Sequence, residues 1–189
     1  MGSAEAIKQS IVNGINVDDV KTLIETVKQD ERAGLTRWKV TSSWQGRTHI
    51  RALIEPFHIG DRTVKRPFAI DIDEPAELGG GNAYPNPQEH LIAALNACMM
   101  VGYVALCALQ GIALEKLEIQ TEGDIDLRGF LGLDDTMPAG YKSLNCTVRI
   151  KGDASEEQFA KIHEMVMATS PNYYNITHPI AVRPTLVVE

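Results

Sequence analysis

Cysteine is scarce in this sequence, which has 3 in 189 residues. An odd number of cysteines without Cys-x-x-Cys spacing fits neither a disulfide framework nor a zinc ribbon, and it indicates a reducing compartment. The start of the chain, Met1 to Lys8, also lacks the basic segment and apolar core of a secretory signal. We therefore expect a cytoplasmic protein.

Basic residues are also fewer than acidic ones, with 18 Lys and Arg residues against 25 Asp and Glu residues and a formal net charge of -7. A nucleic-acid surface needs a clustered excess of basic side chains to neutralise phosphates, and this sequence contains no such cluster. We expect no nucleic-acid partner. A small molecule or another protein chain is the expected partner.

Several motifs of cofactor and metal chemistry are missing. The five histidines include no His-Glu-x-x-His, and no Gly-x-Ser-x-Gly elbow occurs. The glycines at positions 79–81 are not followed by the Lys-Ser/Thr of a phosphate-binding loop. We expect neither a bound metal nor an organic cofactor.

One long hydrophobic run is present, from Leu91 to Leu109, and it carries no formal charge. Such a run approaches the length that spans a bilayer. However, Asn96 and Gly102 interrupt it and no Lys or Arg flanks it closely. We interpret it as a buried central helix of a soluble protein, and we expect no membrane contact.

The remaining pattern predicts an α+β protein with a helical arm over residues 1–35 and a main domain over 36–189. Polar caps predict the helix starts: Asn16 for one helix, Asn86 with Glu89 as a capping box for the central helix, and Ser155 for a later one. Helices are predicted at 4–13, 17–31, 86–110 and from 155 onward, and strands at 38–54, 64–72, 114–127, 143–151 and 180–188.

Cys98 is the strongest candidate for chemistry, because it lies inside the central helix between small residues one turn away, Ala94 and Gly102. This stripe either lets another helix pack closely or leaves room for a slender apolar ligand. Burial favours the neutral thiol, so a reactive thiolate needs a cation or a hydrogen-bond donor. The helix N-terminus lies roughly 18 Å away at 1.5 Å per residue, too far to serve.

Residues 86–98, Asn-Pro-Gln-Glu followed by an alanine-rich stretch and a cysteine, resemble the signature helix of the OsmC/Ohr family, named for osmotically inducible protein C and organic hydroperoxide resistance. The resemblance extends over roughly residues 36–189 and includes the stretch 124–135. It implies antiparallel β-sheets wrapped around a long buried helix. It also implies an intertwined homodimer with active sites at the subunit boundary.

The resemblance assigns roles to individual residues. Cys98 matches the cysteine that attacks the peroxide, and an arginine of the first strand region activates it, with Arg51 favoured over Arg47. The family glutamate that pairs with the arginine is Gln88 here; Glu89 either substitutes for it or serves only the capping box. The family's second, resolving cysteine matches Ser170, so that thiol is missing.

The function expected from these residues is thiol-dependent reduction of small apolar organic hydroperoxides by Cys98, as a defence against oxidative stress, with an external thiol as reductant. Cys107 lies half a turn out of phase on the same helix and cannot pair with Cys98. Cys146 is interpreted as a buried structural residue. The alternative is a catalytically silent dimer that binds an apolar small molecule, which Gln88 and Ser170 favour.

Overall fold

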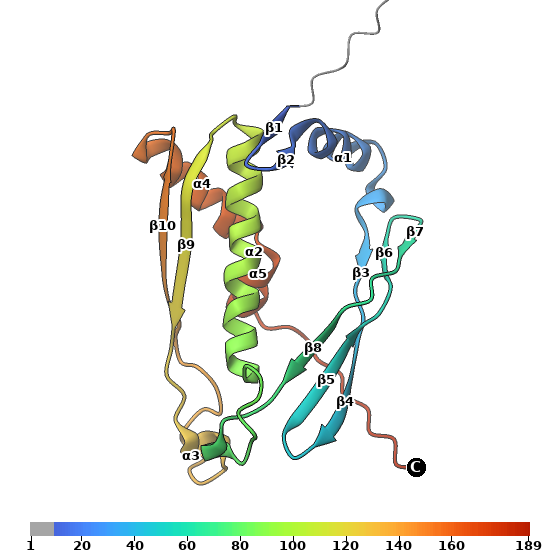
Figure 1. Ribbon diagram of the computed structural model, residues 1–189, viewed down its shortest axis with the longest axis vertical. Coiled ribbons are helices and arrows are strands. Elements are labelled where there is room, and N and C mark those ends of the chain that lie inside the picture. Colours follow the sequence, from blue (N-terminus) through green and yellow to red (C-terminus); the bar gives the residue numbers. More distant parts are fainter. Residues whose placement is uncertain (1–9) are drawn as a thin grey trace, which may run out of the picture. The chain divides into compact units, whose positions relative to one another are not determined.

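The computed structural model describes residues 10–189. The chain divides after Leu91 into two compact units, which are described separately below. Both contain antiparallel strands and helices (Figure 1). The long helix α2 (Pro87–Leu109) begins in the first unit and continues through the second.

The first unit opens with a tight hairpin of β1 (Ile11–Val12) and β2 (Ile15–Asn16). Asn13 and Gly14, at its turn, both have positive φ, as a two-residue hairpin turn requires. The helix predicted at 4–13 is therefore wrong at residues 11–13, because this turn reverses the chain, and residues 4–9 lie outside the described part. Helix α1 (Val17–Gln29) follows, capped by Asn16 as predicted, and a 3-10 turn, η1 (Glu31–Gly34), ends this segment.

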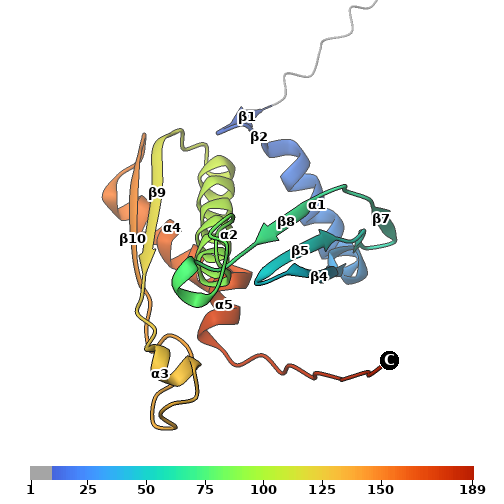
Figure 2. The same cartoon turned by 60° about the horizontal axis from the view of Figure 1, so that its bottom comes forward.

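Two small antiparallel sheets make up the rest of the first unit (Figure 2). One has the order β4-β5-β8, in which β5 (His49–Ile54) lies between β4 (Val40–Gly46) and β8 (Ala69–Ile72). The register of β5 and β8 places Arg51 opposite Asp71. The other sheet has the order β3-β6-β7 and is formed by Thr36–Arg37, Phe57–Ile59 and Arg62–Val64.

The second unit packs a hairpin and two helices on α2. Strands β9 (Leu114–Glu122) and β10 (Asn145–Gly152) pair antiparallel and run along α2 in both views (Figures 1 and 2). The short helix α3 (Leu127–Phe130) lies in their connection. Helix α4 (Glu156–Thr169) starts with the capping box of Ser155 and Gln158, as predicted, and α5 (Pro171–Thr177) follows directly.

The core of the second unit is built on one stripe of α2. The stripe consists of residues four positions apart, all of them buried, namely Leu95, Met99, Tyr103 and Cys107. They pack with Ile162 and Val166 of α4 and with apolar residues of β9 and β10. Between residues 10 and 189, α2 is the one helix long and apolar enough to cross a membrane, a property shared by core helices of soluble proteins. Its buried stripe makes it the core helix of this unit, although Val101 on the other side is 67% exposed.

The predicted strand at 180–188 does not form in the single chain. Residues 179–189 contain no helix or strand, and apolar side chains such as Val182 and Leu186 are exposed there. A strand is stable only when its backbone groups pair with a neighbour, and this segment joins none of the four sheets found in residues 10–189. The alternation of apolar residues was therefore not sufficient to predict pairing.

Candidate functional site

Cys98 has a polar partner that lies far along the chain. The Ser170 hydroxyl donates a hydrogen bond to Cys98 Sγ, with an Oγ–Sγ distance of 3.4 Å. Ser170 joins α4 to α5 and is only 5% exposed, whereas Cys98 is half-buried. The same Oγ accepts a hydrogen bond from the Tyr173 N–H at 3.5 Å. The proton of the Ser170 hydroxyl is then the one donated to the sulfur. A hydroxyl donor in this place stabilises a thiolate more than a neutral thiol.

Residues of α4 and α5 contact the small-residue stripe of α2. Asn172 Nδ2 donates to the Ala94 carbonyl oxygen at 2.9 Å, one turn before Cys98. One turn after it, a Cβ on Gly102 would lie 3.4 Å from Val166. Close packing, one of the two alternatives left by the sequence, is therefore observed at Gly102, whereas Ala94 is exposed and Cys98 is half-buried. The same packing brings the Ser170 hydroxyl to the sulfur.

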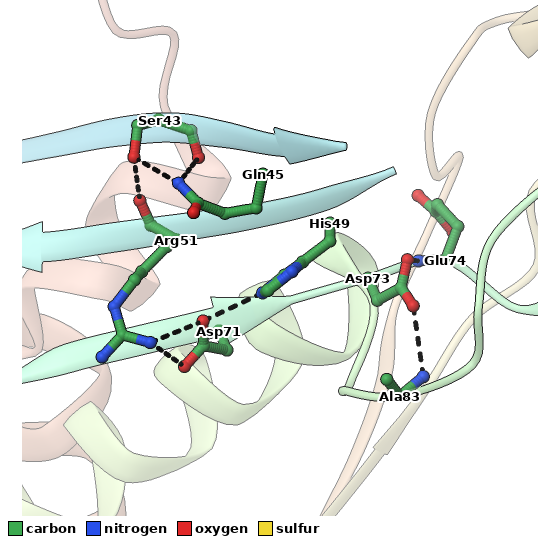
Figure 3. A network of polar contacts seen from close by, with 8 residues as sticks. All are labelled: Ser43, Gln45, His49, Arg51, Asp71, Asp73, Glu74 and Ala83. Carbon is green, nitrogen blue, oxygen red and sulfur yellow. Dashed lines mark hydrogen bonds and ion pairs between the residues drawn. The ribbon is translucent and has the colours of Figure 1, made fainter. Parts of the chain in front are cut away.

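Arg51 belongs to a polar network in the first unit (Figure 3). Its Nη1 donates to both carboxylate oxygens of Asp71, at 3.3 and 3.2 Å. His49 Nε2 lies 3.0 Å from Asp71 Oδ1, and the His49 ring stacks on Tyr84 with centroids 5.0 Å apart. Asp71 is a residue that the sequence analysis missed, because it lies opposite Arg51 only through strand register. The carboxylate holds the guanidinium in one place while about half of the arginine side chain stays exposed.

Arg47 lies in a different setting, at the turn between β4 and β5. Its φ is 49°, a left-handed conformation that is uncommon outside glycine. Trp44 Nε1 donates to the Arg47 carbonyl oxygen at 2.8 Å, so the backbone of this residue shapes the turn. Its side chain is exposed. Among residues 10–189, Asp71 is a carboxylate partner for Arg51, and Arg47 has none.

Glu89 completes the predicted capping box of α2. Its carboxylate accepts a hydrogen bond from the Asn86 N–H at 2.7 Å, and Asn86 Oδ1 accepts one from the Glu89 N–H at 2.8 Å. This exchange satisfies two backbone N–H groups at the helix start. The capping role of Glu89 is therefore confirmed, and its carboxylate is engaged there.

The loop before α2 is organised by a buried carboxylate, Asp73, which is 3% exposed. The carboxylate accepts hydrogen bonds from the Thr48 hydroxyl and from the N–H groups of Glu74, Gly81 and Ala83. These donors lower the pKa of Asp73 from its ordinary value to about 2. The glycines of this loop allow close approach rather than phosphate binding, since a Cβ on Gly80 would collide with the backbone of residue 74.

Asp73→Asn is expected to destabilise the protein at neutral pH, because an amide would turn a donor towards N–H groups that now meet a carboxylate. A lowered pKa means that the contribution is complete above about pH 4 and is lost as pH falls towards 2. The melting temperature at pH 7 should drop by about 5 °C. Scanning calorimetry from pH 7 to pH 2.5 should show this difference shrinking with acid, with the exposed Asp61→Asn as control. A difference that stays constant over that range would contradict the assignment.

The other two cysteines differ from each other. Cys107 is fully buried, and burial raises the pKa of its thiol. Cys146 is exposed near the start of β10, so its interpretation as a buried residue was wrong. It shares a face with Val148 and Ile150, which pack against the core, and alternation does not reveal how far along a strand that face is covered. None of the three cysteines forms a disulfide. Within residues 10–189, no three His, Cys, Asp or Glu side chains are grouped in a way that could hold a metal ion.

Comparison with solved structures identifies the fold. An OsmC-like protein from Mycoplasma pneumoniae is 17% identical, with a TM-score of 0.58 over 76% of this chain and 89% of that chain. An OsmC-like protein of unknown function from Vibrio cholerae is 13% identical, with a TM-score of 0.54 over 74% of this chain and 92% of that chain. The predicted α+β fold, antiparallel sheets with a long central helix, is confirmed. No curated protein matches the sequence.

Comparison with family models identifies the family. The model described as OsmC-like protein matches residues 79–185, which is more than half of the chain. The matched part contains both Cys98 and Ser170, the two residues joined by the long-range hydrogen bond. This chain therefore belongs to the OsmC-like protein family.

Proposed function

We propose that this OsmC-like protein reduces organic hydroperoxides, with Cys98 as the attacking thiol. The observation that supports the proposal best is the hydrogen bond from the Ser170 hydroxyl to Cys98 Sγ at 3.4 Å. The second cysteine of the same helix, Cys107, is instead fully buried in the apolar core. A donor aimed at sulfur favours the thiolate, which is the nucleophilic form.

The first step oxidises the thiol and reduces the peroxide. The Cys98 thiolate attacks one oxygen of the O–O bond, an S–O bond forms, and the O–O bond breaks. The leaving alkoxide takes up a proton and departs as an alcohol, and Cys98 becomes a sulfenic acid. Charge that develops on the leaving oxygen is stabilised by preorganised donors in such a site.

The second step needs a thiol that the chain does not supply at this position. Ser170 stands beside the sulfur and cannot form a disulfide. A small external thiol attacks the sulfenic sulfur, releases water and leaves a mixed disulfide, and a second thiol then regenerates Cys98. The cycle is thus that of a one-cysteine peroxidase in the reducing cytoplasm.

The proposal assigns activation of Cys98 to Arg51. Its guanidinium is fixed by Asp71 and is half exposed, whereas Arg47 shapes a turn. Glu89 is left with its capping role, since its carboxylate is engaged by Asn86. We further propose a homodimer, supported by exposed apolar side chains along α2 such as Val101 and Leu91, which a second copy would cover.

The test exposes reduced protein to excess cumene hydroperoxide and follows each thiol by mass spectrometry after trapping of sulfenic acid with dimedone. We expect rapid adduct formation at Cys98 and none in Cys98→Ser. The matched control is Cys146→Ser, which removes the exposed thiol and should leave the oxidation rate of Cys98 unchanged.

A Cys98 that stays reduced for minutes under excess peroxide would contradict the proposal. That outcome would favour the alternative, a catalytically silent OsmC-like protein that binds an apolar small molecule. Dimedone adducts at Cys146 alone would contradict it as well, because they would show that exposure, rather than the Ser170 contact, decides which thiol reacts.

A further inference from the structure

The second unit contains an open pocket of about 390 Å³, called the cavity below, between β10, α4 and α2. Val148 and Ile150, alternate residues of β10, form one wall, and Phe159 and Ala160 of α4 form the facing wall. These side chains are all apolar. A volume above about 300 Å³ is in the range of small-molecule sites. The cavity is lined by none of the residues that contact Cys98 through hydrogen bonds.

A buried polar side chain, Tyr103, and an exposed one, His163, meet at this cavity. Tyr103 of α2 is buried, and its hydroxyl is hydrogen-bonded to His163 Nδ1 of α4. Burial, followed by the charges of neighbouring cysteines Cys146 and Cys107, raises the pKa of Tyr103 to about 12, so the phenol is neutral at physiological pH. His163 keeps its second ring nitrogen, which donates or accepts according to the tautomer of the pair. A hydroxyl or carbonyl group is well matched to such a partner.

The charge at the cavity selects against anions. Glu156 lines it, and no Lys or Arg does. The whole chain also carries a formal net charge of -7. A carboxylate headgroup would meet a like charge without a cation to offset it. A neutral head on an apolar chain avoids that cost.

We propose that this cavity is a second binding site, for a neutral medium-chain molecule with one hydroxyl or carbonyl group. The apolar chain lies between Val148, Ile150 and Phe159, and the polar head binds the Tyr103–His163 pair. If each non-hydrogen atom with its hydrogens occupies about 30 Å³, as a water molecule does in the liquid, the cavity holds roughly a dozen of them. The proposal is independent of the reaction at Cys98.

Cys146 provides a reporter for this site, because it is exposed and lines the cavity. The experiment measures the rate of its alkylation by N-ethylmaleimide, by mass spectrometry, with increasing 1-octanol as probe. We expect saturable protection that slows alkylation about fivefold or more. Sodium octanoate at the same concentrations should protect much less. Ala160→Trp fills the cavity and should remove the protection by octanol.

Lys161→Trp is the matched control, since it places the same indole on α4 at an exposed residue that does not line the cavity. It should keep full protection. Circular dichroism of both variants checks the fold. Absence of saturable protection up to 1-octanol's solubility limit, or equal protection in Ala160→Trp, would overturn the proposal. Equal protection by octanoate would overturn the assigned ligand class.

Discussion

Ser170→Cys is expected to convert the protein into one that forms a disulfide with Cys98 when it meets a hydroperoxide. The Ser170 Oγ lies 3.4 Å from Cys98 Sγ, so a sulfur in its place needs only a small shift to reach bonding distance. The sulfenic acid at Cys98 would condense with the new thiol and release water. Intact mass spectrometry should show the loss of two hydrogens in nearly all molecules, and reductant should reverse it.

Ser170→Ala is the matched control, because it removes the donor without adding a thiol. It should form no disulfide, and Cys98 should oxidise about tenfold more slowly, as expected for one lost hydrogen bond to a charged group. A disulfide to Cys107 or Cys146 in the Ser170→Cys variant would show that the observed contact does not govern the chemistry. Unchanged oxidation in Ser170→Ala would show that the hydroxyl serves only to cap α5.

Arg51→Met is expected to slow oxidation of Cys98 by about a hundredfold or more, the usual effect of removing one preorganised donor from an active site. Methionine keeps much of the side-chain volume and removes the charge. The measurement is the second-order rate with cumene hydroperoxide across pH 5 to 9.

Arg47→Met serves as the control for Arg51→Met, since each substitution removes one positive charge. Arg51 lies in β5, and Arg47 lies in the turn just before that strand. The rate and pH profile of Arg47→Met should match those of the unmodified protein. A large effect in Arg47→Met with none in Arg51→Met would reverse the assignment. Equal small effects in both variants would remove arginine activation from the proposed mechanism.

The sequence determined the features that depend on neighbours within a few residues. Asn16, Asn86 with Glu89, and Ser155 with Gln158 cap helices as predicted, because each side chain bonds to backbone N–H groups two or three residues away. The central helix follows from its continuous apolar composition. The signature residues 86–98 of the family resemblance belong to the start of that same helix. Their relative positions are therefore set by local helix geometry.

Tertiary structure decided the features that depend on pairing over long distances. Ser170 and Cys98 are 72 residues apart and meet because α4 and α5 pack on the small-residue stripe of α2. Arg51 meets Asp71 through the register of β5 and β8, and a shift of one residue would separate them. The predicted strand at 180–188 failed for the same reason, since alternating residues show that a segment can pair but not whether a partner is present. Hydrogen bonds between residues close in sequence can be predicted from those residues alone. Helix packing and strand register depend on segments far apart in the sequence, so they are decided only when the whole chain has folded.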